Sequence, residues 1–221
     1  LKPVLRTLQE SGFTNITVVK EQEQPNGNFP TCPYPNPEIH EAMALGIEYA
    51  RRYDADLLLA TDPDCDRVGI AIKDENGKYV LLSGNETGML LLDYICSRKI
   101  ANGMMPKNPI LVKTIVTTDM AERIALHYGV ETKNMLTGFK FIGEQIGVLE
   151  AKGQSERFIF GFEESYGCLI GTYARDKDAI VATMALCEAA AYYKTQGKTL
   201  WDAMIEMYEQ FGYYKDDIKA V

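Results

Sequence analysis

The second half of the chain alternates short apolar segments with longer segments of helical periodicity. The apolar segments predict strands, and apolar positions that recur at intervals of three and four predict helices. The expected strands are 110–116, 132–136 and 158–162, and the expected helices are 118–128, 141–150, 178–195 and 199–211. Strands that alternate with helices of this length form a mostly parallel sheet with helices on both faces. We therefore predict an α/β fold.

The first half of the chain carries the same mixture of elements. The sequence predicts helices at 1–12, 38–53 and 85–100, the last capped by Asn85, strands at 17–19 and 57–60, and a hairpin of 68–72 and 79–82. Residues 25–37 contain five prolines, which forbid regular structure and predict a long surface loop. Because an α/β unit usually begins on a buried strand, the opening helix suggests a piece of a longer chain.

A break at residues 102–109, Asn-Gly-Met-Met-Pro-Lys-Asn-Pro, interrupts both the helical and the strand pattern. Two prolines and a glycine in so short a segment are typical of a linker. The 221 residues also exceed the usual size of one domain, which is about 100–150 residues. We therefore expect two three-layer α/β/α domains with mostly parallel mixed sheets, residues 1–103 and residues 104–221.

Charge and composition exclude several classes of partner. The net charge of −8 argues against a nucleic-acid surface, which needs clustered cationic side chains. No apolar segment approaches the ~20 residues that cross a bilayer, so we expect no membrane association. The five cysteines form no Cys-x-x-Cys pair, which predicts reduced thiols and a cytoplasmic location instead of a disulfide framework or a zinc site.

Three aspartates, Asp62, Asp64 and Asp66, alternate on a short segment that directly follows the apolar residues 57–60. Three carboxylates so placed can converge on one hard divalent cation such as Mg²⁺. A solvated acidic turn is the simpler alternative, although like charges repel unless a cation lies among them. An EF-hand is excluded because cationic residues occupy the loop positions that need glycine and glutamate. A phosphatase of the haloacid dehalogenase type, which also places Asp-x-Asp after a buried strand, is a further alternative.

Arg67 follows the third aspartate directly. Its guanidinium can bind a phosphate in bidentate fashion beside a metal-bound carboxylate cluster, which would indicate phosphoryl chemistry. Electrostatics alone supports equally well a salt bridge from Arg67 to its own aspartates.

A second polar cluster, Gly-Phe-Glu-Glu-Ser-Tyr-Gly at 161–167, follows the apolar residues 158–160. In an extended segment, residues two apart project to the same side. Glu163 and Ser165 could therefore bind neighbouring hydroxyls of a sugar, while Glu164 would face the other way. The alternative is a helix N-cap with acidic residues in the first turn.

Cationic side chains lie just before two of the expected helices. Arg175 and Lys177 precede the helix at 178, where a phosphate could also meet helix N–H groups, and Lys140 lies on the turn before the helix at 141. Each basic site considered alone is more often a solvated surface.

Four motifs occur in one order: Thr-Asp-Pro-Asp-Cys-Asp-Arg, Thr-Gly-Phe-Lys, Gly-Phe-Glu-Glu-Ser-Tyr-Gly and Arg-Asp-Lys-Asp. Together they resemble the α-D-phosphohexomutases, the phosphoglucomutase and phosphomannomutase family. The resemblance implies that Asp62, Asp64 and Asp66 bind Mg²⁺. It also implies a catalytic role for Arg67 at the phosphoserine side of the site.

The same resemblance assigns roles to the second half of the chain. It implies that Glu163 and Ser165 read the sugar and that Lys177 lies near the transferring phosphate as a catalytic residue. Lys140 and Arg175 are expected to bind the hexose phosphate substrate as well.

Family members also have parts that this sequence does not show. They have four domains, with a phosphorylated serine followed by histidine in the first and an Arg-x-Ser-Gly-Thr phosphate loop in the fourth. None of the five serines here precedes a histidine, and no Arg-x-Ser-Gly-Thr occurs. We therefore expect most of a second domain plus the third, whose partners are the missing first and fourth domains of the same chain.

The resemblance implies that the parent enzyme interconverts hexose 1-phosphate and hexose 6-phosphate through a phosphoserine and a bisphosphate intermediate. Glucose is favoured over mannose, because Tyr166 stands where some mannose-tolerant members have a small residue. The chain alone is expected to be inactive. Its alternative description is a non-catalytic fragment that binds metal and sugar phosphate.

Overall fold

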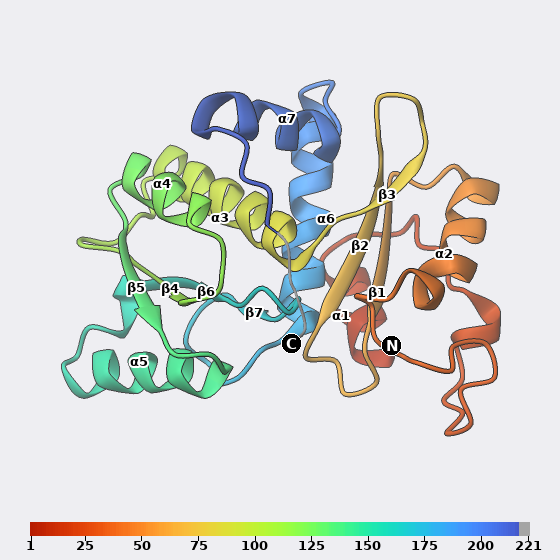
Figure 1. Ribbon diagram of the computed structural model, residues 1–221, viewed down its shortest axis with the longest axis horizontal. Helices are drawn as coiled ribbons and strands as arrows, with labels where there is room; N and C mark the ends of the chain where they lie inside the picture. The colour runs from red at the N-terminus through yellow and green to blue at the C-terminus, as the bar shows by residue number, and fades with distance from the viewer. Residues whose placement is uncertain (217–221) are drawn as a thin grey trace.

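The computed structural model describes residues 1–216, which form two β-sheets with helices packed around them (Figure 1). The α-helices are α1 (Lys2–Glu10), α2 (His40–Tyr53), α3 (Gly84–Ala101), α4 (Met120–His127), α5 (Phe139–Ala151), α6 (Ala179–Thr195) and α7 (Leu200–Phe211). The strands are β1 (Leu57–Thr61), β2 (Val68–Lys73), β3 (Tyr79–Leu81), β4 (Ile110–Thr114), β5 (Glu131–Met135), β6 (Phe158–Phe162) and β7 (Cys168–Leu169). Short 3-10 helices lie at Lys20–Gln22 and Ser155–Arg157.

The first sheet has the order β1-β2-β3 and is antiparallel throughout. Alternate residues of β2 face opposite sides, as the two-residue period of a strand requires. Ala71 packs with Met43 of α2, whereas Ile70 and Ile72 enter the main core on the other face. The last pair of the β1–β2 ladder is Thr61 with Val68, so residues 62–67 form the loop between these two strands.

The second sheet has the order β5-β4-β6-β7, in which β4 pairs in parallel with both β5 and β6, and β7 runs antiparallel to β6. The carboxyl ends of β4, β5 and β6 therefore meet at one edge, the usual position of ligand sites in α/β sheets. α5 packs against one face, and α3 and α4 pack against the other. In Figure 1, α6 runs between the two sheets, and it contacts strands of both.

One large apolar core takes side chains from both sheets and from the helices between them. α3 supplies many of these side chains, including Met89 and Leu92, which are fully buried. Its Gly88 lies so close to β6 that a Cβ atom there would be 2.1 Å from the ring of Phe162. The close approach of α3 to the second sheet therefore depends on a residue without a side chain.

The structure confirms the α/β fold and the parallel pairing in the second half of the chain, together with the predicted hairpin. In the first half the three strands pair antiparallel, so the mostly parallel sheet expected there is not found among residues 1–216. The strand expected at 17–19 is wrong: these residues form no ladder with another part of the described chain, and β1 is the edge of its sheet. Asn85 is not the cap of α3. Ser83 takes that role because its side chain and that of Glu86 form a reciprocal capping box.

The expected domain boundary between residues 103 and 104 stays a prediction. All five cysteines lie among the described residues, where each is a free thiol. Within residues 1–216, no helix combines the length and the apolar composition needed to cross a bilayer.

Candidate functional site

The side chain of Asp62 organises the loop between β1 and β2. Its Oδ1 accepts hydrogen bonds from the backbone N–H groups of Asp66, at 3.0 Å, and Arg67, at 3.1 Å. The backbone turns at Cys65, which has a φ of 65°, and a residue other than glycine in this region stores strain of about 1–3 kcal/mol. The side chain of Asp62 is 1% exposed. This buried carboxylate therefore holds the loop in place through its backbone hydrogen bonds.

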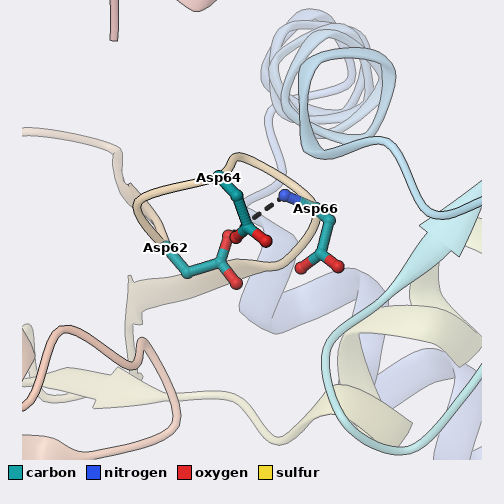
Figure 2. A group of neighbouring side chains, drawn as sticks. All are labelled: Asp62, Asp64 and Asp66. Atoms are coloured by element: carbon teal, nitrogen blue, oxygen red, sulfur yellow. Dashed lines mark hydrogen bonds between the residues drawn. The ribbon is translucent and has the colours of Figure 1, made fainter.

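The carboxylates of Asp62, Asp64 and Asp66 converge in this loop (Figure 2). One oxygen from each can be chosen so that all three lie within 4.8 Å of one another. Asp62 is buried, Asp66 is half-buried and Asp64 is exposed, so the cluster opens to solvent on one side. The predicted convergence of the three carboxylates is confirmed, and the simple solvated turn does not describe a loop whose first carboxylate is buried.

Arg67 lies against its own loop. Its Nε donates to Asp62 Oδ2 at 2.7 Å, and its guanidinium also faces Glu38 Oε1, at 3.3 Å, and Asp66 Oδ1, at 3.7 Å. Burial alone would raise the pKa of Asp62, but the hydrogen bonds from Arg67 and the loop N–H groups outweigh it and lower that pKa. The predicted salt bridge between Arg67 and its own aspartates is therefore confirmed. Glu38 forms a second ion pair, with the outer part of the guanidinium.

Glu38 had not been predicted as part of the site. It follows the proline-rich loop, which lies so close to β2 that a Cβ atom at Gly69 would be 2.7 Å from the backbone oxygen of Pro37. The prolines predict a surface loop there, but no sequence spacing connects Glu38 with Arg67, because helix α2 and strand β1 lie between them in the chain.

Lys177 joins the aspartate loop to the second polar cluster. Its Nζ lies 3.0 Å from Asp66 Oδ2 and 3.5 Å from Glu163 Oε1. Burial raises the pKa of Glu163, and the nearby ammonium only partly offsets that effect. One lysine thus faces a carboxylate from each of the two loops.

The segment from Glu163 to Gly167 forms the tight loop between β6 and β7. Glu163 N donates to Gly167 O at 3.0 Å, and Ser165 Oγ donates to Glu163 Oε1 at 3.0 Å. The predicted projection of Glu163 and Ser165 to one side is confirmed. The helix-cap alternative is wrong, because the next element is strand β7 and not a helix.

The two loops are also joined through their backbones. Val68 N donates to Tyr166 O at 3.2 Å, and Arg67 forms an isolated antiparallel bridge with Gly167. The side chain of Lys177 passes directly over Gly167, where an added Cβ atom would lie 2.1 Å from Lys177 Cδ. A glycine at 167 therefore lets the lysine reach both carboxylates.

Asp178 is the N-cap residue of α6. Its Oδ1 accepts from the N–H groups of Ile180, at 2.7 Å, and Val181, at 3.4 Å. These N–H groups are therefore satisfied within the chain, so they are not offered to a phosphate in this arrangement.

Two predicted residues lie apart from this cluster. Arg175 pairs with Glu150 Oε2 at 2.6 Å and donates to the backbone oxygens of Thr172 and Ala174. Lys140 is exposed, and its Nζ lies 4.9 Å from the ring centre of Phe141. Neither forms a hydrogen bond or ion pair with Glu163, Ser165 or the three aspartates in the part of the chain that the structure describes, so their roles in substrate binding stay predictions.

The aspartate loop fits a hard divalent cation. An aspartate oxygen has about two acceptor sites, and Asp62 Oδ1 already accepts two hydrogen bonds whereas Oδ2 accepts one. Asp62 can thus contribute one oxygen to a cation, next to the more open carboxylates of Asp64 and Asp66. An all-oxygen donor set with several negative charges is what Mg²⁺ and Ca²⁺ require.

Comparisons with known proteins agree on one family. Residues 2–77 match the family model of phosphoglucomutase/phosphomannomutase, alpha/beta/alpha domain II, and residues 83–211 match that of domain III. The chain is 36% identical over 211 residues to a phosphoglucomutase of Staphylococcus aureus (strain USA300), which covers 96% of this chain and 37% of that protein. The chain thus spans less than two-fifths of the length of this curated relative.

Solved structures show the same fold. A phosphoglucomutase/phosphomannomutase family protein from Burkholderia thailandensis aligns with a TM-score of 0.62 at 20% identity, over 82% of this chain and 35% of that chain. The N-acetylphosphoglucosamine mutase of Aspergillus fumigatus, solved in complex with GlcNAc-6P and magnesium, aligns with a TM-score of 0.50 at 18% identity, over 72% of this chain and 36% of that chain. Because the two family models match most of the chain, and match it in chain order, this chain belongs to the phosphoglucomutase/phosphomannomutase family.

Proposed function

We propose that this chain supplies the metal-binding and sugar-reading parts of a phosphohexomutase. The whole enzyme would interconvert hexose 1-phosphate and hexose 6-phosphate through a phosphoserine and a bisphosphate intermediate. The observation that carries the proposal is the position of Lys177, which faces Asp66 of one loop and Glu163 of the other. A phosphate near this ammonium would lie between the metal loop and the sugar loop.

Asp62, Asp64 and Asp66 are the residues that would hold Mg²⁺, and a magnesium complex exists for a protein of the same fold. When bound, Mg²⁺ would neutralise phosphoryl charge and polarise a phosphoryl oxygen. Arg67 is held by ion pairs with Asp62 and Glu38, and the N–H groups that these two carboxylates do not use would bind a phosphate. Lys177 would stabilise the same charge as a point charge.

Glu163 and Ser165 would bind hydroxyls of the hexose. Their mutual hydrogen bond orients both side chains before a ligand arrives, which reduces the entropy lost on binding. Hydroxyls common to both orientations of the bisphosphate would be read in this way while either phosphate faces Lys177. We favour glucose over mannose on the basis of Tyr166, and the curated relative named above is a phosphoglucomutase.

The covalent step needs a nucleophile, and none of the five serines has the family's serine-histidine motif. We therefore propose that the catalytic serine and the phosphate loop are contributed by the first and fourth domains of the parent enzyme. The chain alone would act as a binding unit for metal and sugar phosphate. Its location would be the cytoplasm, where its thiols stay reduced.

A coupled assay tests this proposal directly. The purified 221-residue chain, supplied with Mg²⁺, glucose 1-phosphate and glucose 1,6-bisphosphate, should give no glucose 6-phosphate above background, yet it should bind the bisphosphate in a calorimetric titration. Mutase turnover by the chain would contradict the proposed division of labour. Metal-dependent release of phosphate that is lost in Asp62→Asn would instead support the dehalogenase-type phosphatase.

A further inference from the structure

Adjacent glutamates in the loop after β6 face opposite directions. Glu163 points to Ser165 and Lys177, as described above. Glu164 points to the neighbouring strand, where its Oε2 accepts hydrogen bonds from Thr114 Oγ1 at 2.9 Å and from Thr117 Oγ1 at 3.1 Å. The expected reversal of Glu164 is thus confirmed, and its partners lie outside the site described so far.

The two threonines form a buried binding site for this carboxylate. Thr114 ends β4, Thr117 lies in the connection to α4, and neither is more than 2% exposed. Their hydroxyl oxygens lie 2.7 Å apart. Each hydroxyl has one hydrogen, and when both are donated to the carboxylate the three side chains form one compact polar cluster. A carboxylate that accepts from two buried hydroxyls forms stronger bonds than a neutral acceptor, and its loss would leave both hydroxyls without that acceptor.

The loop that Glu164 anchors contains a strained residue. Tyr166 has a φ of 67°, which a bulky residue adopts only when its surroundings force it. On one side, Tyr166 O accepts the hydrogen bond of Val68 N. On the other side, the loop lies against the start of α3, where a Cβ atom at Gly84 would be 2.0 Å from Glu164 O. Glu164 provides the side-chain anchor between these two backbone contacts.

We infer that Glu164 is a positioning residue, which fixes the β6–β7 loop so that Glu163 and Ser165 bind the hexose in one geometry. The inference rests on the proposed function, because it concerns the same sugar-reading loop. Without the anchor, Tyr166 relaxes towards the extended region, and the backbone that carries both sugar-reading side chains moves with it. Glu164 acts through this backbone and does not itself contact the substrate.

The test is a calorimetric titration of glucose 1,6-bisphosphate into the wild-type chain and three variants in Mg²⁺. Glu164→Ala should weaken binding by about tenfold, whereas Glu164→Gln, whose amide oxygen still accepts a hydrogen bond, should recover most of the affinity. Thr117→Val, which keeps the carboxylate but removes one donor, should weaken binding by about threefold. The dissociation constant for Mn²⁺ should be the same in all four proteins.

Amide hydrogen exchange adds a readout that does not depend on a ligand. The N–H groups of Glu163 and Val68, which bond to Gly167 O and Tyr166 O, should exchange faster in Glu164→Ala and Thr117→Val than in the wild type. The N–H groups of α5 should be unchanged, which shows that the variants are folded.

The outcomes separate the inference from the proposed function. Wild-type binding that Glu164→Ala and Thr117→Val leave unchanged would overturn the positioning role and leave the proposed function intact. A wild-type chain that binds metal but no bisphosphate would overturn the proposed function and this inference with it. Equal loss of affinity in Glu164→Ala and Glu164→Gln, with no change in exchange, would overturn the anchoring geometry.

Discussion

Lys177 and Asp66 form an ion pair, Nζ to Oδ2 at 3.0 Å, that links the regions matched by the two family models. The side chain of Lys177 is 19% exposed and that of Asp66 is 29% exposed, so water screens the pair only in part. The ammonium is therefore paired with Asp66, one of the three carboxylates that would hold a metal ion. Metal and lysine should therefore compete for Asp66.

Removal of Asp64 should abolish metal binding by the chain. Asp64 is exposed, so Asp64→Ala removes a donor oxygen with little effect on folding. Calorimetric titration with Mn²⁺ should show one site in the wild type and none in the variant. Asp56→Ala is the matched control, because Asp56 is an exposed aspartate just before β1, at the opposite end of that strand. Equal binding by Asp64→Ala and wild type would exclude the aspartate loop as the metal site.

Removal of the Lys177 ammonium should change the two affinities in opposite directions. Lys177→Met keeps an unbranched apolar side chain but removes the ammonium that pairs with Asp66. Mn²⁺ should then bind about fivefold more tightly, equivalent to ~1 kcal/mol for a partly exposed ion pair, whereas glucose 1,6-bisphosphate should bind more weakly. Lys194→Met, which removes a more exposed ion pair with Asp56, should change neither affinity. Weaker Mn²⁺ binding in Lys177→Met would contradict the competition.

The site was predictable from sequence wherever the loop itself carries the chemistry. The alternating aspartates and the pair Glu163 and Ser165 each directly follow an apolar strand, so their place at the end of a strand and their residue types are visible in the sequence. The contact of Lys177 with Asp66 could not be found in this way, because it depends on how two loops far apart in the chain are joined. For the same reason the sequence does not reveal that Arg175 forms an ion pair with Glu150 of α5 and does not contact the site.

The fold shows the same division. The long helices and the strands at 110–116 and 158–162 have strong periodicity and were found to within a few residues. β7 consists of Cys168 and Leu169 alone, which is too short for any period to be visible. Residues 17–19 are β-branched enough to suggest a strand, but a strand exists only where a neighbouring segment exchanges backbone hydrogen bonds with it. The strand propensity of residues 17–19 therefore predicted a strand that does not form, because no neighbouring strand pairs with them in the described part of the chain.

Replacement of Glu163 should reduce affinity for the sugar phosphate with little loss of stability. Glu163→Gln keeps the shape of the side chain but removes its charge, so one charge-assisted hydrogen bond to a sugar hydroxyl is weakened. The dissociation constant for glucose 1,6-bisphosphate should rise about tenfold, equivalent to ~1.4 kcal/mol, and the melting temperature should stay within a few degrees. Glu131→Gln is the control, because Glu131 lies at the opposite end of β5 from the site. A variant that melts early but binds normally would return Glu163 to a structural role.

Asp93 should make the stability of the chain depend on pH. Burial raises the pKa of Asp93, although the hydrogen bond from the Tyr128 hydroxyl, at 2.8 Å, and the nearby His127 offset part of that effect. A carboxyl whose pKa is raised by folding stabilises the native state below its unfolded pKa, and this contribution is lost as the pH rises through the folded pKa.

The variant Asp93→Asn removes this titration while its amide oxygen can still accept from Tyr128. Urea denaturation of both proteins at pH 4.5 and pH 7.5 should show the stability of the variant, relative to wild type, increase from the lower to the higher pH. A difference that stays constant or decreases with pH would show that burial does not control this carboxyl.

Two glycine substitutions test how closely α3 packs on β6. Gly88→Ala would place a Cβ atom 2.1 Å from the ring of Phe162, which is itself buried and stacked on Phe160 with ring centres 5.3 Å apart. Because neither the helix backbone nor these rings can move freely, the substitution should reduce the free energy of unfolding by about 1–3 kcal/mol or more. Gly147→Ala in α5 is the matched control, since no atom lies within 4 Å of its added Cβ. There the better helix propensity of alanine should raise the free energy of unfolding by up to about 1 kcal/mol. Urea denaturation measures both, and a Gly88→Ala protein as stable as Gly147→Ala would show that α3 does not lie against the second sheet as described.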